Sequence, residues 1–127
     1  MKMFIRIMKA LSDPNRLKVV KMLQVKTMCV CELQAALGIS QSSVSKHLKS
    51  LEEAGLIDSR KEGLWVNYFL STGDRSPYAA SLLGNLRHWL NDDPTVEKLL
   101  QQIPFLNREE LCGRSFRPGQ KDLKPDI

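Results

Sequence analysis

Residues 38–51 read GISQSSVSKHLKSL, and this stretch decides the fold that the sequence predicts. Gly38 and Ile39 favour a short turn, and Ser40 follows as the N-cap of a helix, a position at which serine is common. We expect a helix that runs from Gln41 to Ala54 and ends at Gly55. On a helical wheel one side of this helix is polar and basic, and the opposite side carries the apolar residues Val44, Leu48 and Leu51.

The polar side of this helix suits the major groove of DNA. Its first two turns carry no acidic residue, short hydroxyl and amide side chains can approach base edges, and lysines can reach phosphates. For any single residue, an ordinary solvated helix face is the alternative interpretation. The candidate DNA-contacting residues of this helix are Gln41, Ser42, Ser43, Ser45, Lys46, His47 and Lys49.

The spacing of apolar residues changes after this helix. Residues 56–61 and 64–70 are strand-like and are joined across Glu62-Gly63, which predicts a β-hairpin. Arg60 and Lys61 then lie at the hairpin tip, where they can reach the minor groove or the flanking DNA backbone. In the second strand Val66, Tyr68 and Leu70 alternate with Trp65, Asn67 and Phe69, so one face can pack on the core while the other meets solvent or a partner.

Three helices are expected before residue 38. The first is amphipathic and is indicated by the spacing of Phe4, Ile7, Met8 and Leu11. Ser12-Asp13-Pro14 ends it and starts the second, and the third spans Cys29 to Leu37 before Gly38. The third and fourth helices form a helix-turn-helix with the hairpin as its wing. The predicted fold class is therefore mainly α with a β-hairpin wing, a winged helix-turn-helix.

The chain continues with two further helices beyond the hairpin. One begins near Pro77 and carries an apolar face, and the next begins at Asp93-Pro94 and reaches Ile103. The residues of that apolar face are Leu82, Leu83, Leu86, Trp89 and Leu90. We divide the chain into a winged-helix domain of residues 1–103 and a tail of residues 104–127 that we expect to be flexible.

Composition narrows the class of protein. The 127 residues contain 19 Lys and Arg against 14 Asp and Glu, a net charge of +5. All of this excess lies within residues 1–70, the part that contains the predicted DNA-binding helix and wing. There is no apolar run long enough to cross a membrane and no secretion signal, and three cysteines do not form a disulfide framework. We therefore expect a cytoplasmic protein, and no residue pattern of an enzyme active site is present.

The sequence resembles the ArsR/SmtB winged-helix repressors. The likeness covers roughly residues 3–90 and rests on LSDPNRL at residues 11–17, SQSSVSKHL at residues 40–48 and LEEAGLI at residues 51–57. It implies a homodimeric repressor that releases operator DNA when it binds a metal or metalloid. In the family the first helix and the helix after the wing pair the subunits, so residues 1–103 would serve both DNA binding and dimerisation.

Cys29-Val30-Cys31-Glu32-Leu33 resembles the Cys-Val-Cys-Asp-Leu box of the members that respond to arsenic, antimony, lead and cadmium. Thiolates are soft ligands that select thiophilic ions. Side chains two positions apart on a helix point about 200° from each other, so one ion that takes both sulfurs must deform the helix. Ion binding would thereby act as a switch. The plainer interpretation is that free cysteines pack as small hydrophobic residues, and a thiol redox sensor is a further possibility.

The identity of a third thiol ligand stays open. Arsenic-responsive members often carry another cysteine where this chain has Gln34, and Cys112 is the remaining candidate, as ligand or as bystander. His47 and His88 do not match the zinc-responsive relatives. The preferred inducer is arsenite or antimonite, bound by Cys29, Cys31 and Cys112. Cadmium or lead sensing, redox sensing, and a winged-helix module that binds proteins instead of DNA are the alternatives.

Overall fold

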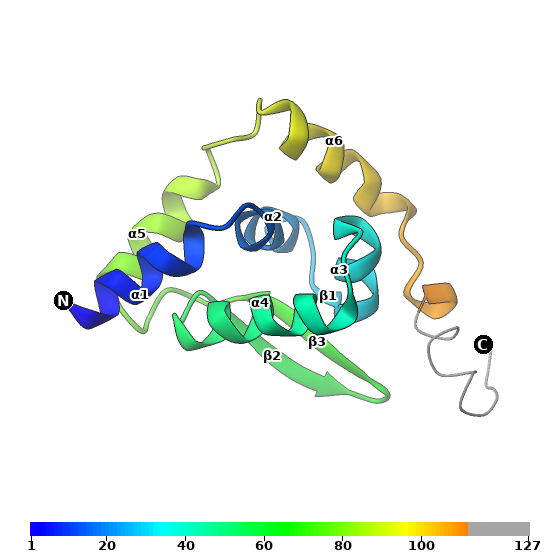
Figure 1. The fold of residues 1–127 in the computed structure, drawn as a ribbon, viewed down its shortest axis with the longest axis horizontal. Coiled ribbons are helices and arrows are strands. Elements are labelled where there is room, and N and C mark those ends of the chain that lie inside the picture. The colour runs from blue at the N-terminus through cyan, green and yellow to red at the C-terminus, as the bar shows by residue number, and fades with distance from the viewer. Residues whose placement is uncertain (112–127) are drawn as a thin grey trace.

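The structure is a computed structural model that describes residues 1–111, within which a small sheet lies at one edge of a group of helices (Figure 1). The elements are, in order, α1 (Lys2–Leu11), α2 (Pro14–Leu23), β1 (Met28–Cys29), α3 (Val30–Leu37), α4 (Gln41–Glu53), β2 (Ile57–Glu62), β3 (Trp65–Leu70), α5 (Pro77–Leu86), α6 (Pro94–Gln102) and the 3-10 helix η1 (Ile103–Phe105).

Local capping residues set the helix boundaries, as the sequence predicts. The Asp13 carboxylate accepts from the backbone N–H groups of Asn15 and Arg16 at 2.8 and 3.1 Å, which begins α2. The Ser40 hydroxyl accepts from the Ser43 N–H at 3.2 Å and begins α4. Gly38 ends α3 at a φ of 69°, a left-handed conformation that favours glycine. The predicted α3–turn–α4 unit is confirmed.

The sheet has three antiparallel strands in the order β1-β3-β2, one more than the hairpin that the sequence predicts. In the extra strand, Met28 pairs with Tyr68 and Cys29 with Asn67. The prediction that Cys29 lies in the third helix is therefore wrong. Cys29 is the extended N-cap residue of α3, with φ −93° and ψ 171°, and the helix begins at Val30.

The predicted β-hairpin wing is confirmed, with one difference. Its turn lies at residues 63–64, so Arg60 and Lys61 precede the tip instead of forming it. The sequence left open which face of β3 packs on the core; Val66 is exposed, whereas Asn67 on the opposite face is buried. The alternation is as predicted, and Tyr68 and Leu70 do pack against the core. On the other face, Arg108 of the C-terminal segment donates a hydrogen bond to the buried Asn67.

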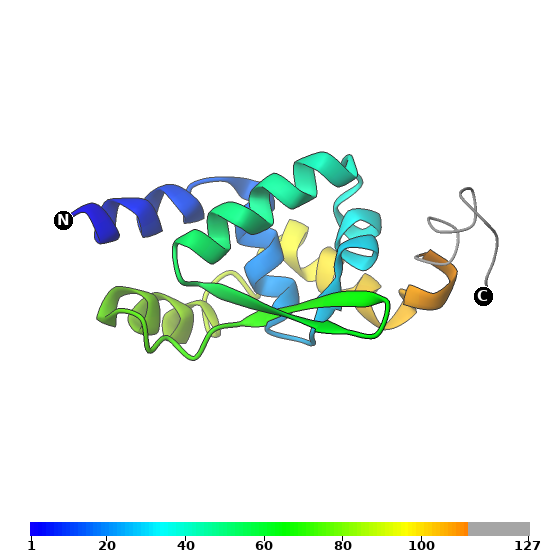
Figure 2. The ribbon, with the colours of Figure 1, turned by 90° about the horizontal axis from the view of Figure 1, so that it is seen from below.

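The core lies around α2, which Figures 1 and 2 show between the α1–α5 pair at one end and α3 at the other. The buried residues Val19, Val20 and Met22 of α2 pack with apolar side chains from the surrounding helices and from β2. Helix α4 contributes the three residues that the sequence assigns to its apolar side, Val44, Leu48 and Leu51. The orientation of α4 is therefore fixed by this core, and its polar side faces outward.

The helix after the wing is shorter than predicted. Helix α5 ends at Leu86, and Trp89 lies beyond it with 50% of its surface exposed. The chain turns away at Leu90, which has a φ of 69°. Buried Lys21 holds this turn through hydrogen bonds from its ammonium group to the carbonyl oxygens of Leu86 and Trp89.

The described chain continues past the predicted domain boundary. Residue 103 opens η1, and Leu106 packs against the core. Residues 108–111 form a last helical turn beside α3 and the wing, which Figure 2 shows at the opposite end of the molecule from α1. The rest of the predicted tail, with Cys112, lies outside the described residues.

Candidate DNA-binding surface and thiol site

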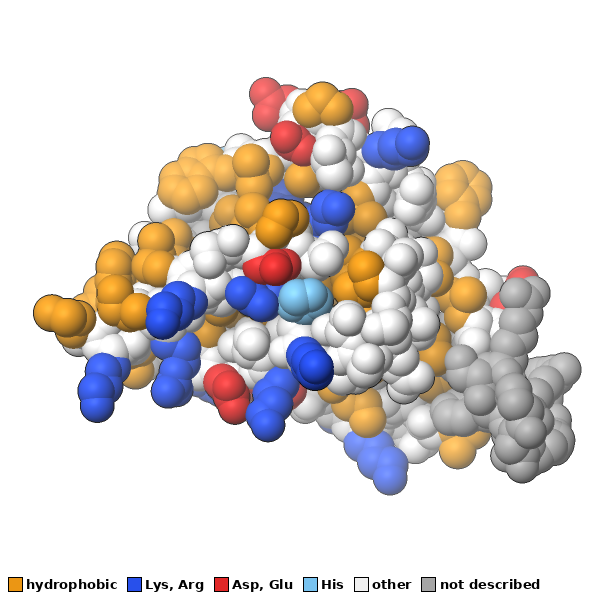
Figure 3. All heavy atoms as spheres, viewed as in Figure 1, with side chains coloured by type: hydrophobic (Ala, Val, Ile, Leu, Met, Phe, Trp, Pro, Cys, Tyr) orange, Lys and Arg blue, Asp and Glu red, His pale blue; other side chains and the backbone are white. Residues whose placement is uncertain are grey.

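Helix α4 presents the predicted DNA-contacting residues to solvent. Gln41, Ser42, Ser45, Lys46 and Lys49 are all exposed. Figure 3 shows Lys and Arg side chains along the face that α1 and α4 share. The structure therefore brings together on one exposed face the hydroxyl, amide and lysine side chains that the sequence groups as a reading surface.

Two of the predicted contact residues also stabilise α4. The Ser43 hydroxyl lies 2.9 Å from the Ser40 hydroxyl, within the N-terminal cap, and Ser43 is only half-buried. His47 is half-buried, and its Nδ1 lies 3.3 Å from Nη1 of Arg16. The guanidinium of Arg16 also donates to the carbonyl oxygens of Ala10 and Lys9 at 2.7 and 3.1 Å. Arg16 thus joins the end of α1 to the middle of α4, a role that the sequence did not reveal.

The basic residues of the wing lie on β2. Arg60 lies over the ring of Phe69, with 5.0 Å between the guanidinium carbon and the ring centroid. Its side chain is 65% exposed and its Nη1 lies 3.9 Å from a carboxylate oxygen of Glu62. Lys61, the next residue, is exposed. Both cations are accessible to a phosphate backbone, and Arg60 is held in place by its aromatic and acidic neighbours.

The two cysteines lie where the sheet meets α3. Cys29 is buried at the end of β1, and Cys31 is half-buried in the first turn of α3. Cys31 lines an open pocket of about 350 Å³. The other residues of its wall are Gln34, Ala35, Gly38, Ile39 and Leu111. Leu111 is the residue before Cys112, so the described chain ends at the wall of the pocket that Cys31 lines.

The two cysteines belong to no larger cluster of metal-binding side chains in the part of the chain that the structure describes. Within residues 1–111 no group of three or more His, Cys, Asp or Glu side chains is arranged to hold a metal ion. His47 and His88 are not brought to the cysteines as part of any such group. The third cysteine of the chain, Cys112, lies outside the described residues.

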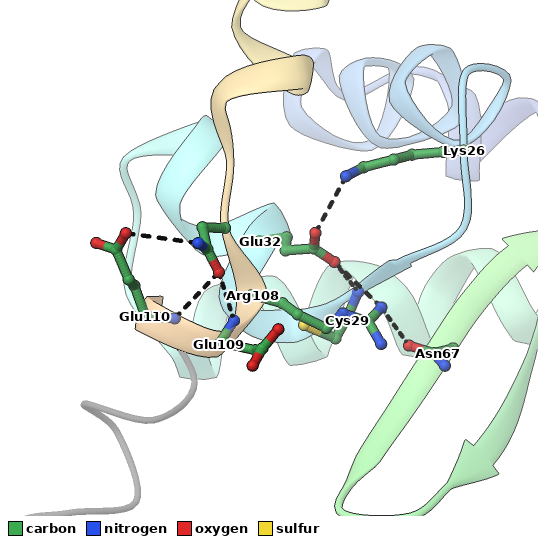
Figure 4. Close-up of polar contacts among 8 residues, drawn as sticks. Lys26, Cys29, Glu32, Asn67, Arg108, Glu109 and Glu110 are labelled. Carbon is green, nitrogen blue, oxygen red and sulfur yellow. Dashed lines mark hydrogen bonds and ion pairs between the residues drawn. The ribbon is translucent and has the colours of Figure 1, made fainter. Parts of the chain in front are cut away.

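The buried carboxylate of Glu32 lies close to Cys29 and contacts several polar groups (Figure 4). Glu32 accepts from the backbone N–H of Cys29 at 2.9 Å, which completes a capping box at the start of α3. Lys26 and Arg108 lie 3.3 Å from its two oxygens. Arg108 also donates to Oδ1 of Asn67 at 2.6 Å. The sequence did not identify Arg108, because nothing in its local pattern indicates contacts with residues so far away in the chain.

Comparisons with known proteins identify the family. The model of "Bacterial regulatory protein, arsR family" matches residues 13–59. The chain is 46% identical over 68 residues to the "Arsenical resistance operon repressor" of Escherichia coli K12, a match that covers 53% of this chain and 58% of that protein. It is 38% identical over 120 residues to the "Arsenic resistance transcriptional regulator ArsR2" of Pseudomonas putida KT2440, covering 94% of this chain and 89% of the relative.

A solved structure agrees with this assignment. The homodimeric winged helix-turn-helix DNA-binding domain Mb0332 of Mycobacterium bovis superposes with a TM-score of 0.59 at 25% identity, covering 68% of this chain and 77% of that one. Among residues 1–111, no helix combines the length and apolar character that a membrane span requires. The predicted winged helix-turn-helix fold is confirmed. The chain therefore belongs to the ArsR family of bacterial regulatory proteins, which are DNA-binding transcriptional regulators and not enzymes.

Proposed function

We propose that this protein is a homodimeric repressor that binds operator DNA and releases it when arsenite or antimonite binds Cys29 and Cys31. The observation that carries the proposal is the position of the two thiols. They lie on either side of the start of α3, and α3 packs against α4, the helix that presents the reading surface. A ligand that changes the start of α3 therefore acts on the element that supports α4.

The residues present fit a thiophilic ligand. Two sulfur donors are the soft ligands that trivalent arsenic and antimony prefer over oxygen or nitrogen. Cys31 lines an open pocket and gives the ligand a way in, whereas Cys29, two residues earlier, is buried. Cys112 follows Leu111 at the wall of this pocket, and we propose it as the third ligand.

The switching argument takes a different form from the one that the sequence suggests. Cys29 is not helical, so the ion does not have to pull together two residues of one regular helix. Instead, coordination by both sulfurs constrains the backbone of residues 29–31, where the capping box of α3 and the last pairing of β1 now set the conformation. The ion would favour a conformation in which these contacts change, and DNA would favour the present one.

DNA binding is assigned to α4 and the wing. Lys46, Lys49, Arg60 and Lys61 would contact phosphates, and the short side chains of Gln41, Ser42 and Ser45 would contact base edges. Ser43 and His47 lie at the same surface, but their side chains already contact groups of the protein. Ser43 contacts the Ser40 hydroxyl in the cap of α4, and His47 contacts Arg16. We expect these two to affect DNA binding mainly by positioning α4.

The homodimer is assigned to α1 and α5. Met3, Phe4, Ile5 and Met8 of α1 are each between 41% and 50% exposed, an apolar surface on an otherwise amphipathic helix. Tyr78 of α5 is also 41% exposed, and its ring meets that of Phe4 edge to face with centroids 5.2 Å apart. A second copy of this surface would remove these side chains from water.

The experiment that tests the proposal measures release of DNA and metal binding together. An operator is first selected from random duplexes, and its occupancy is then measured against arsenite, cadmium and zinc, with native mass spectrometry of each mixture. We expect arsenite to bind and to lower operator occupancy. Release by cadmium alone would make this a cadmium sensor, and release by oxidant alone a redox sensor. If the affinity for random duplex DNA did not depend on salt concentration, phosphate contacts would be absent, and a winged-helix module that binds proteins would be favoured.

A further inference from the structure

A continuous series of polar contacts runs from the thiol site to Arg60 on the wing. The backbone N–H of Cys29 and a guanidinium nitrogen of Arg108 both donate to the same oxygen of Glu32, Oε1, at 2.9 and 3.3 Å. The same nitrogen of Arg108 donates to Oδ1 of Asn67 at 2.6 Å (Figure 4). Asn67 in turn donates through Nδ2 to Glu62, and Glu62 is the acidic partner of Arg60.

The strand register places the same residues side by side. Asn67 of the central strand β3 is opposite Cys29 of β1 and opposite Arg60 of β2. Residues directly opposite each other in antiparallel strands have their side chains on the same face of the sheet. One face of the sheet therefore carries, in a row, a thiol of the sensing pair, a buried amide and a wing cation.

Arg108 is the residue that closes this series. It comes from the C-terminal segment, lies over the ring of Trp65 with 4.8 Å to the centroid, and bridges Glu32 to Asn67. The Glu32 side chain is 3% exposed, so its charge depends on the cations beside it. If a change at Cys29 moves Glu32, Arg108 has to move with it. Otherwise the buried carboxylate of Glu32 loses part of its ion pairing.

We infer that Arg108 is a positioning residue that couples the thiol pair to the wing. This inference rests on the proposed function and adds to it a second route, through the sheet, besides the contact of α3 with α4. Coordination at Cys29 changes the capping contact on Oε1 of Glu32, and Arg108 shifts with that oxygen. The hydrogen bond from Asn67 to Glu62 then changes, and with it the ion pair of Glu62 with Arg60. The wing then loses the conformation in which Arg60 meets DNA.

Lys26 provides a matched control because it contacts the same carboxylate through its other oxygen. Lys26 lies 3.3 Å from Oε2 of Glu32, on the side of the carboxylate away from Asn67 (Figure 4). Replacement of Lys26 or of Arg108 by alanine removes one cation from Glu32 in each case. Only the second replacement interrupts the series of contacts.

The test measures a coupling ratio, which is the operator Kd with saturating arsenite divided by the Kd without it. Allosteric couplings are typically about 5- to 150-fold. We expect the wild type and Lys26→Ala to fall in that range, and Arg108→Ala to give a ratio that is several-fold smaller but still above 1, because the contact of α3 with α4 remains. Arsenite stoichiometry, measured by native mass spectrometry, should be the same in all three proteins. Arg108→Gln, which keeps an amide donor for Asn67 but not the charge, should give an intermediate ratio.

The fluorescence of Trp65 supplies an independent readout of the contact between Arg108 and the wing. The chain contains two tryptophans, so Trp89→Phe leaves Trp65 as the sole emitter. Arsenite should shift the Trp65 emission in this background, and Arg108→Ala should abolish the shift because the cation no longer lies on the ring. A purely structural role for Arg108 would lower the unfolding temperature without changing either readout.

The outcomes separate this inference from the proposed function. A wild type whose operator occupancy does not respond to arsenite overturns both. A wild type that responds, together with an Arg108→Ala variant of equal coupling ratio, overturns the inference alone. Loss of arsenite binding in Arg108→Ala also overturns it, because Arg108 would then belong to the ligand site.

Discussion

The ammonium group of Lys21 donates a 2.6 Å hydrogen bond to the carbonyl oxygen of Leu86, the last residue of α5. The same group donates to the Trp89 carbonyl at 2.8 Å and to the Asn91 side chain at 2.7 Å. Lys21 is completely buried, and this burial lowers its pKa below the ordinary value of 10.5. One side chain of the central helix thus fixes where α5 ends and where the chain turns toward α6.

Lys21→Met should destabilise the protein. The variant leaves three acceptors without their donor, and we expect a loss of roughly 2 to 4 kcal/mol in the free energy of unfolding, measured by urea denaturation at neutral pH. Lys18→Met, on the same helix, is the control and should cost much less. Because the folded protein lowers the pKa of Lys21, this residue makes wild-type stability rise with pH between the folded pKa and 10.5, a slope that Lys21→Met should lack. Equal stability of the two variants would contradict the assigned role.

Asp13, the N-cap residue of α2, should make the stability of the protein depend on pH in the acidic range. Burial alone raises the pKa of Asp13, but the N–H groups of Arg16 and Asn15 outweigh it and hold that pKa below the ordinary 3.8. A lowered carboxylate pKa contributes stability above pH 3.8 that is lost as the pH falls through the folded pKa. Asp13→Ala should therefore cost about 1 kcal/mol at pH 7 and progressively less below pH 3.8, measured by thermal unfolding. A difference that stayed constant down to about pH 2 would rule out this titration.

Lys46→Ala and Arg60→Ala should weaken operator and random DNA alike. Each is assigned to a phosphate, so each variant should reduce the slope of log K against log salt by about 1. Ser42→Ala and Ser45→Ala should leave that slope unchanged and alter the preferred sequence instead, as read by repeated selection from random duplexes. Unchanged affinity of Lys46→Ala at low salt would show that α4 does not face the DNA in this way.

The cysteine variants should separate DNA binding from release. Cys29→Ser and Cys31→Ser should each bind the operator as the wild type does and remain bound at arsenite doses that release the wild type, because a hydroxyl does not replace a thiolate toward a soft ion. Titration of operator occupancy by fluorescence anisotropy measures this. Cys112→Ser should shift the release curve to higher dose, because we propose Cys112 as the third ligand, and an unmoved curve would contradict that assignment. Full release of a Cys29→Ser/Cys31→Ser double variant would refute the sensing mechanism.

A charge placed on the apolar surface of α1 should dissociate the dimer. Phe4 is 41% exposed and meets Tyr78, so Phe4→Glu would put a carboxylate where a second copy is expected to pack. Sedimentation of the variant at micromolar concentration should give a monomer, and its operator affinity should fall. Phe105→Glu is the control, since Phe105 is 86% exposed in the C-terminal part of the chain and should leave the dimer intact. A monomeric wild type would disprove the assignment of this surface.

The sequence by itself determined the features that depend on neighbouring residues. The helix boundaries and the helix-turn-helix follow from local chemistry, because each capping residue begins or ends a helix through groups within one turn of itself. These residues are Asp13-Pro14, Gly38 and Ser40. The apolar spacing of α4 likewise separates its buried side from its polar side, because the helical period alone decides which of its side chains share a face.

The tertiary structure decided what depends on distant partners. Cys29 is extended because it pairs with Asn67, and Asn67 is buried where Arg108, 41 residues further along the chain, donates a hydrogen bond to it. Lys21 is buried because it finds acceptors 65 to 70 residues away. A polar side chain enters the interior only where partners replace its water, and the positions of such partners are set by the fold as a whole and not by the residues beside it.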